Sequence, residues 1–368
     1  MSHRVTVIPG DGIGPEVVGA TRRAIEATGV AIAWEVHELG QAATAGEGTP
    51  MPAATLDAIR STGVALKGPV ATPVSSGMRS INVALRQALD LYACIRPCTL
   101  YPGVPSVYDQ VDLVVVRENT EGMYTGIEFE QGSATTGELI GFIGQRTGRW
   151  IREDSGISIK TISERGSERI VRRAFEYAKA NGRKKVTASH KANIMKFSDG
   201  LFLEVARRVA AEEFPDMAFE DRIIDALCMQ LIQAPERFDV LVMPNLYGDV
   251  VSDLVAGEIG GLGVAPGAHM GDALAVFEAT HGTAPRYAGS NRANPMGLML
   301  SGAMLLRHLG EREAGDRLQA AVAAVVAEGV HTTADLRVDR TDPMAGTTTG
   351  FTDAVVDRLR DRSPEPAR

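Results

Sequence analysis

An apolar run of strand length that passes through a turn into a helical pattern is the feature that most constrains how this chain can fold. Residues 239–244 form this run, and a helix can begin at Asp249 and continue to Ala256. Such a unit places Asp249 and Asp253 beyond the carboxyl end of a strand, where open α/β sheets bind their ligands. We therefore expect these two aspartates to mark the functional site.

Carboxylates four residues apart on a helix lie on one face, with Cβ atoms about 5–6 Å apart, and their like charges repel. A hard divalent cation would convert this repulsion into coordination. The alternative interpretation is that the helix dipole favours two acidic residues near a first turn. The stretch alone does not decide between a metal site and this simpler explanation.

Strand and helix patterns alternate along the rest of the chain. We expect strands at 4–8, 64–67, 111–116 and 185–190, and helices at 164–180, 296–309 and 314–328. This alternation predicts an α/β fold with a doubly wound, mostly parallel sheet. At 368 residues the chain exceeds the size at which one core usually keeps growing, so two domains are expected.

Charge and cysteine content argue against several classes of protein. The net charge of −8 gives no basic field for general nucleic-acid binding. Cys94, Cys98 and Cys228 form no zinc-type pattern, and we interpret them as reduced thiols of a cytosolic protein. No signal-peptide core and no apolar run of about 18 residues occur, so we expect a soluble, cytoplasmic protein without a membrane partner.

Arginines near the ends of expected elements indicate an anionic substrate. Ser80 can cap a helix that carries Asn82 and Arg86, Arg96 precedes a proline, and Arg117 follows the strand at 111–116. Each arginine alone is typical of a solvated surface charge. Together they would suit a small molecule with several carboxylates, because a guanidinium binds a carboxylate through two parallel hydrogen bonds.

Residues from about 125 to 157 depart from the alternating pattern. They are rich in small and polar residues, yet they carry too many large apolar side chains for a free linker, among them Phe142 and Trp150. We expect this excursion to pack against a second subunit.

The chain resembles the β-decarboxylating dehydrogenases, the family of isocitrate, isopropylmalate, homoisocitrate and tartrate dehydrogenases. The resemblance covers nearly the whole chain, and its most specific segments are 90–97, 245–253 and 281–285. It implies a large, cofactor-side domain formed by residues 1–98 and 257–368. It also implies a smaller α/β domain formed by residues 99–256, in which the excursion is an intersubunit clasp.

The resemblance implies a role for each candidate site residue in a homodimer with shared active sites. Tyr124 and Lys191 would be the acid–base pair, although a lysine at a strand end is more simply a surface charge. Asp249 and Asp253, with the partner subunit's Asp225, would hold Mg²⁺ or Mn²⁺. The substrate would be bound by Ser80, Asn82, Arg86, Arg96 and Arg117. The cofactor would be bound by Thr72, Glu278, His281, Gly282, Thr283, Ala284, Arg286, Tyr287 and Asn294.

Isocitrate is the substrate that the resemblance favours. Ser80 and Asn82 stand where isopropylmalate dehydrogenases place apolar residues, and a polar pocket penalises an apolar ligand that leaves its donors unpaired. Homoisocitrate and tartrate dehydrogenation are alternatives. A non-catalytic regulatory subunit is a further alternative, but such a subunit should have lost some of the acid–base or metal residues, and all of them are present.

Arg286 favours NADP as the cofactor. NAD-using relatives carry an acidic residue near this position that binds the adenosine ribose, whereas an arginine favours a 2′-phosphate. Ala234, Ala334 and Val338 argue for NAD instead, because bacterial NADP-using relatives carry arginine or tyrosine there. Arg337, one position from Val338, is an alternative source of the missing charge. The sequence therefore predicts NADP, with NAD as the alternative.

Overall fold

The computed structural model of the chain describes residues 2–71 and 80–361, so the predicted cofactor residue Thr72 lies outside the described residues. The strands are β1 (His3–Ile8), β2 (Ile32–Val36), β3 (Val64–Lys67), β4 (Ala93–Thr99), β5 (Asp112–Glu118), β6 (Glu128–Phe129), β7 (Ile157–Ser158), β8 (Lys185–His190), β9 (Ala218–Ile223), β10 (Val240–Met243), β11 (Ala268–Met270) and β12 (Ala275–Phe277). The α-helices are α1 (Gly14–Ala27), α2 (Gln41–Glu47), α3 (Ala53–Thr62), α4 (Ile81–Ala88), α5 (Ala134–Thr147), α6 (Glu164–Ala180), α7 (Asp199–Glu213), α8 (Ile224–Gln233), α9 (Asn245–Glu258), α10 (Met296–His308), α11 (Arg312–Glu328) and α12 (Thr348–Asp361).

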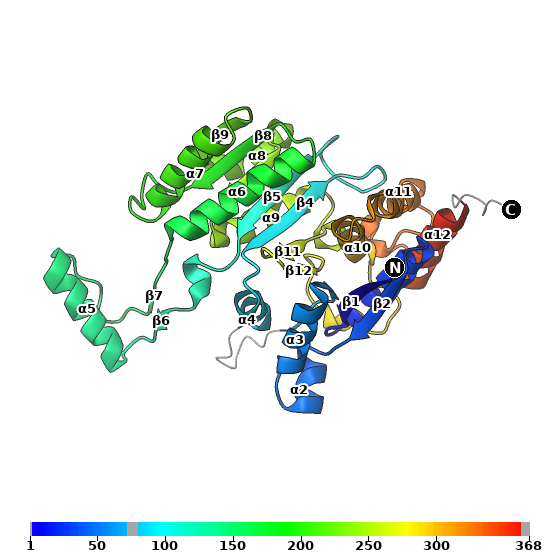
Figure 1. Cartoon of the computed structure of the whole chain (residues 1–368), viewed down its shortest axis with the longest axis horizontal. Helices are drawn as coiled ribbons and strands as arrows, with labels where there is room; N and C mark the ends of the chain where they lie inside the picture. The colour runs from blue at the N-terminus through cyan, green and yellow to red at the C-terminus, as the bar shows by residue number, and fades with distance from the viewer. Residues whose placement is uncertain (1, 72–79, 362–368) are drawn as a thin grey trace.

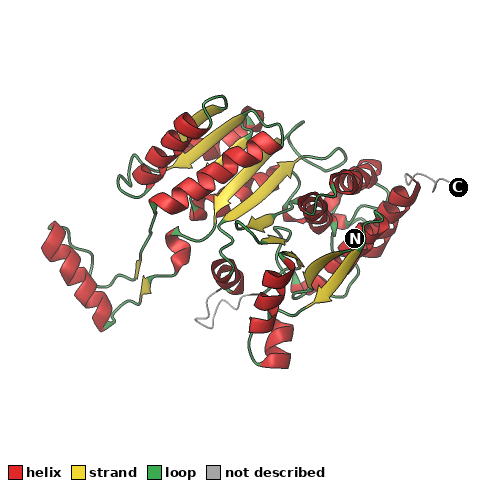
Figure 2. Ribbon diagram, in the orientation of Figure 1, coloured by secondary structure: helices red, strands yellow, loops and turns green. Residues whose placement is uncertain are grey.

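In the described part of the chain, ten strands form one sheet in the order β2-β1-β3-β12-β11-β4-β5-β10-β8-β9. Pairing is antiparallel only at the centre, between β12 and β11, β11 and β4, and β4 and β5. Helices cover both faces, with α6 and α7 in front of the strands and α8 and α9 behind them (Figures 1 and 2). The predicted α/β class and the mostly parallel sheet are confirmed.

The predicted start of the helix that carries the two aspartates is wrong. We expected a turn up to Asp249, but α9 begins at Asn245, directly after Pro244. Asp249 therefore lies beyond the first turn, and that turn holds no acidic residue. The helix dipole acts mainly on the first turn, so it does not explain why two aspartates stand here.

The predicted positions of two arginines are also wrong. Arg96 and Arg117 do not follow regular elements but lie within the neighbouring central strands β4 and β5, where both are buried. Pro97 is tolerated inside β4 because it lies beyond Ile95, the last residue of β4 that pairs with β11. Ser80 is the N-cap residue of α4, as predicted, but its side chain makes no capping hydrogen bond.

The core is divided between the two faces of the sheet. One group of buried apolar residues extends from α1 and α10 to α9, and another lies between the central strands and helices α6 and α7. Strand β10, Val-Leu-Val-Met, is buried throughout, as expected for a parallel strand covered on both faces. The central strands therefore lie between two apolar layers.

Residues 125–157 extend from the body of the molecule as an arm (Figure 1). Strands β6 and β7 pair as its stem, and α5 lies at its end. Phe142 and Trp150 are 59% and 68% exposed. More than half of each side chain is therefore left uncovered by the described residues of this chain.

No helix in the described ranges combines the length and the apolar character needed to cross a membrane.

Candidate active site

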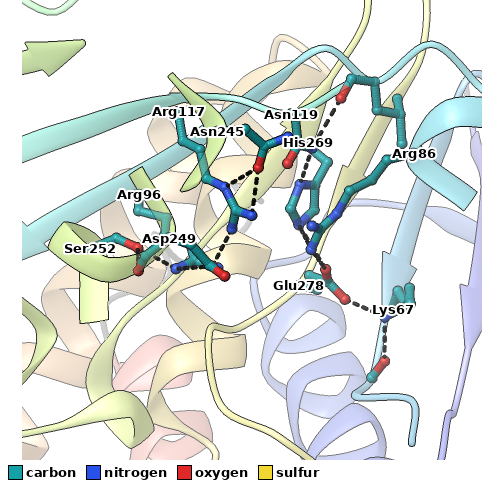
Figure 3. A network of polar contacts seen from close by, with 12 residues as sticks. Lys67, Arg86, Arg96, Arg117, Asn119, Asn245, Asp249, Ser252, His269 and Glu278 are labelled. Atoms are coloured by element: carbon teal, nitrogen blue, oxygen red, sulfur yellow. Dashed lines mark hydrogen bonds and ion pairs between the residues drawn. The ribbon is translucent and has the colours of Figure 1, made fainter. Parts of the chain in front are cut away.

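Helix α9 presents a polar face to the central strands. Asn245, Asp249, Ser252 and Asp253 recur at spacings of about one turn, so they lie along one side of the helix. Arg117 donates hydrogen bonds to Asn245 Oδ1 from Nε (3.0 Å) and Nη2 (2.8 Å), and it also contacts Asp249 (Figure 3). The helix and strand β5 are thus joined through a buried guanidinium.

Close approach of α9 to β5 depends on a glycine. A Cβ atom at Gly248 would lie 2.5 Å from the Cβ and Cγ atoms of Arg117. Any larger residue here would therefore displace the arginine from its partners.

Arg96 binds the next turn of the same helix. It donates to the Ser252 hydroxyl, and its Nη1 lies 3.1 Å from Asp253 Oδ1 and 4.0 Å from Asp249 Oδ1. The arginines of two adjacent strands therefore contact the two aspartates that the sequence singled out.

The two carboxylates differ in acidity. Burial acts to raise the pKa of Asp249, but Arg117 and the Tyr124 hydroxyl outweigh it and hold that pKa below its usual value. Burial raises the pKa of Asp253, and the neighbouring Asp249 adds to this effect, although Arg96 opposes it. Asp253 therefore carries a negative charge that the chain compensates only in part.

Tyr124 reaches the same cluster from a short 3-10 helix, Gly122–Thr125. Its hydroxyl donates to Asp249 Oδ2, and its ring lies 4.9 Å from the guanidinium carbon of Arg117. Burial, together with the charge of Asp249, raises the pKa of Tyr124. The hydroxyl consequently keeps its proton at neutral pH and can serve as a proton donor.

Lys191 and Asp225 belong to a different part of the chain. They form an ion pair with each other between the end of β8 and the start of α8, and neither contacts Tyr124, Asp249 or Asp253 within the described ranges. Nor do those ranges contain a group of three or more His, Cys, Asp or Glu residues placed to hold one metal ion. One chain therefore brings together two of the three predicted metal ligands and one of the two acid–base residues.

Glu278 is the centre of a second buried network (Figure 3). It pairs with Lys67, its Oε1 lies 2.7 Å from His269 Nε2, and Arg86 Nη2 lies 3.6 Å from it. Asn119 fixes the other side of His269, with 3.0 Å between Asn119 Nδ2 and His269 Nδ1. Burial acts to raise the pKa of Glu278, but Lys67, His269 and Arg86 hold it well below the usual value.

A cavity of about 120 Å³ joins the predicted substrate and cofactor residues, and its walls include Asn82, Arg86, Arg96, Glu278, His281 and Gly282. Several wall atoms are buried without a hydrogen-bond partner among the described residues, namely Asn82 Oδ1, Arg86 Nε, Thr280 Oγ1 and His281 Nε2. Because buried polar groups are normally paired, these atoms indicate the place of a polar ligand.

A second cavity, of about 260 Å³, shares His281 with the first. Its walls include the predicted cofactor residues Ala284, Tyr287 and Asn294. Thr283 lies beside them, where its carbonyl accepts a hydrogen bond from the Ile13 N–H at 2.9 Å. Arg286 is exposed on the 3-10 helix Pro285–Tyr287 and does not line either cavity.

Sequence reasoning missed several residues of this region. Lys67 and His269 were passed over because one ends a short apolar strand and the other stands among small residues, and neither position has a charged neighbour in sequence. Arg292, Asp335 and Arg340 line the larger cavity. These three residues belong to no recognisable motif, and only the folded structure shows that they lie around one cavity.

The sheet is mostly parallel, its central strands present buried arginines to two aspartates, and two cavities lie on either side of His281. Together with its likeness to a solved dehydrogenase, this architecture places the chain in the class of α/β dehydrogenases. More narrowly, it belongs to the isocitrate/isopropylmalate dehydrogenase family, whose model matches residues 4–355.

Relatives of this chain include enzymes named for both nicotinamide cofactors. It is 44% identical to isocitrate dehydrogenase (NAD) catalytic subunit 5, mitochondrial, of Arabidopsis thaliana, over 96% of this chain and 88% of that one. It is 41% identical to isocitrate dehydrogenase (NADP) of Archaeoglobus fulgidus, over 95% and 91%. The crystal structure of isocitrate dehydrogenase from Methylococcus capsulatus matches with a TM-score of 0.88 and 47% identity, over 97% and 99% of the two chains.

Proposed function

We propose that the chain oxidises isocitrate to 2-oxoglutarate and CO₂ and reduces NADP. The main support for this proposal is the polar wall of the smaller cavity. Asn82, Arg86 and Arg96 line it together with Glu278 and His281. The unpaired Nε–H of Arg86 in this wall suits a substrate carboxylate, and the unpaired Oδ1 of Asn82 can accept from a substrate hydroxyl. An apolar substrate would leave both atoms unsatisfied.

Asp249 and Asp253 would hold Mg²⁺ or Mn²⁺ together with the partner subunit's Asp225. The fit rests on two carboxylates that lie one turn apart on one face of α9, where a cation could reach them from solvent, and on the partly uncompensated charge of Asp253. Hard cations prefer such oxygen ligands. When bound, the cation polarises the hydroxyl and carboxylate of the substrate, and the nicotinamide accepts the hydride.

The side chains of the protein would position the substrate and move protons. Arg86, Arg96 and Arg117 would bind the carboxylates and fix the orientation of the C2–H bond. The partner subunit's Lys191 would take the proton of the C2 hydroxyl. After CO₂ leaves, Tyr124 would deliver its proton to C3, which its raised pKa supports because the hydroxyl remains protonated until then.

A homodimer would complete this site. Helices α8 and α9 carry large apolar side chains that are between 40% and 58% exposed, Met229, Ile232, Leu246 and Val250. Contiguous exposed apolar residues are typical of a protein interface. A second copy seated here would also bring its own Lys191 and Asp225 toward the first chain, and the arm at 125–157 would then clasp the partner.

The same proposal includes two domains, one formed by residues 1–98 and 257–368 and the other by residues 99–256. It also includes NADP as the preferred cofactor. A cytoplasmic location stays a prediction, since the names of several relatives place them in mitochondria.

The test is the rate of reduced-nicotinamide formation with isocitrate and Mn²⁺, with NADP and NAD compared. Homoisocitrate, tartrate and isopropylmalate serve as alternative substrates. We expect turnover of isocitrate with a preference for NADP, loss of activity with a chelator and recovery with added Mn²⁺. Faster turnover of another substrate would contradict the substrate assignment, and faster turnover with NAD would contradict the cofactor assignment.

A further inference from the structure

Two arginines of the larger cavity have no partner. Arg292 comes from the loop before α10, and Arg340 from the loop that follows the 3-10 helix Ala334–Leu336. Within residues 2–71 and 80–361, neither guanidinium makes a hydrogen bond or an ion pair. Two unpaired cations in the wall of one cavity form a site for an anion.

The sequence suggested Arg337 as the charge that replaces the missing arginine at Val338. In the structure, Arg337 is bound to other groups. Its Nη1 lies 3.0 Å from Asp342 Oδ2, and the rest of the guanidinium donates to the carbonyls of Val330, Thr332 and Met344. All of these partners belong to its own loop. Arg337 therefore holds the loop together, and Arg340 is the residue of this loop that is free to face the cavity.

The remaining walls suit an adenosine. Ile13, Ala284 and Ala293 provide apolar surface for a base. Asn294 and Asp335 provide polar groups, and they are fixed by a hydrogen bond of 2.8 Å from Asn294 Nδ2 to Asp335 Oδ2. Asp335 also accepts from the Thr333 hydroxyl at 2.6 Å. A carboxylate held in this way suits ribose hydroxyls or an exocyclic amino group.

We propose that Arg292 and Arg340 bind the 2′-phosphate of NADP and that they, more than Arg286, set the cofactor preference. This inference rests on the proposed function. Guanidinium groups bind phosphate through paired, charge-assisted hydrogen bonds, and unpaired arginines need not give up an internal partner to do so. Arg286 contributes less because it lies outside the cavity wall.

The experiment compares Arg292→Ala, Arg340→Ala and the double variant with Arg286→Ala and with a distant control, Arg165→Ala, an exposed arginine of α6. Calorimetry measures the affinity for adenosine 2′,5′-bisphosphate and for adenosine 5′-monophosphate, which needs no catalysis. Steady-state rates then give kcat/KM for NADP and for NAD with each variant.

We expect each single variant to lose about 10- to 100-fold in affinity for the bisphosphate, with unchanged affinity for the monophosphate. The double variant should bind the two ligands about equally, and kcat/KM for NAD should not change. Arg286→Ala should lose less affinity for the bisphosphate than either single variant. Arg165→Ala should lose none.

Two results overturn the inference, and they can be told apart. If the unmodified protein prefers the bisphosphate and both single variants keep that preference, the arginines are misassigned while the NADP proposal stands. If the unmodified protein binds both ligands equally, there is no 2′-phosphate site, and the NADP proposal fails with it.

Discussion

The two cavities hold their arginines in opposite ways. In the smaller cavity Arg86 and Arg96 are buried and contact internal acidic groups, and the adjacent Arg117 is held in the same way. In the larger cavity Arg292 and Arg340 are exposed and unpaired. The paired arginines are fixed in place before a ligand arrives, so their removal should disturb the structure around them. Removal of the unpaired ones should cost only the contact with the ligand.

Arg117→Gln would test an arginine that is held by internal partners. It should have the largest effect of the variants proposed below. It removes the guanidinium from Asp249 and Asn245 and leaves the partly buried Asp249 carboxylate with only Tyr124 and the more distant Arg96 among the described residues. We expect kcat/KM for isocitrate to fall by about 10³-fold. Arg117→Lys should restore little of it, because an ammonium cannot form the fork of hydrogen bonds. Steady-state kinetics measure the loss. A fall of tenfold or less would make this arginine no different from those of the larger cavity.

Lys67→Met asks whether a fully buried lysine that lines neither cavity, but pairs with Glu278 of the cavity wall, behaves in the same way. Glu278 would keep His269 and Arg86 but lose its contact with the fully buried ammonium. We expect the free energy of unfolding to fall by about 3 kcal/mol. Urea titration measures this loss. The double variant Lys67→Met with Glu278→Gln should recover part of it, and additive losses in the double variant would contradict the pairing.

Glu258→Gln extends the comparison to an acid that is buried without a partner. Neither carboxylate oxygen of Glu258 has one among the described residues, and burial raises its pKa from 4.5 to about 7. A raised pKa means that the contribution of this group to stability is fully present below pH 4.5 and is lost as the pH rises through about 7. Thermal unfolding at pH 8 should show the variant to be more stable by about 2 kcal/mol.

At pH 4.5 the advantage of Glu258→Gln should vanish, because the native glutamate is then protonated as well. An equal gain at both pH values would show that the effect comes from packing and not from charge.

Asp342→Asn should have the smallest effect. It tests the difference between the paired Arg337 and the unpaired Arg340 of the same loop. It weakens the hold on Arg337, which is partly exposed. We expect a loss of less than about 1 kcal/mol in stability, as for exposed ion pairs. The NADP to NAD ratio of kcat/KM should change less than about twofold, since Arg337 also stays bound to backbone carbonyls. A large fall in the ratio would assign Arg337 a direct role in cofactor binding.

Local patterns predicted several of the longer regular elements. The helix at 164–180 and the strand at 185–190 match α6 and β8 residue for residue, because their side-chain periodicity is unbroken. Arg96 and Arg117 were placed at element ends because a charged residue inside a central strand is unexpected from local sequence. They are tolerated there only because α9, far along the chain, supplies Asp249 and Ser252.

The candidate site was predictable where it follows a family pattern and not where it depends on distant contacts. The two aspartates and three arginines came from motifs in the sequence. Lys67 did not, because its partner Glu278 is 211 residues away in sequence and no local signal links them. Arg292 and Arg340 could not be separated from other surface arginines without knowledge of the cavity that they share.

The position of β11 and β12 has a consequence for synthesis of the chain. These two short strands lie between β3 and β4 in the sheet, although residues 268–277 are made long after both. Until they emerge from the ribosome, β3 and β4 each present an unpaired edge that another nascent chain can bind. The nascent chain therefore carries two open sheet edges throughout the synthesis of residues 100–267.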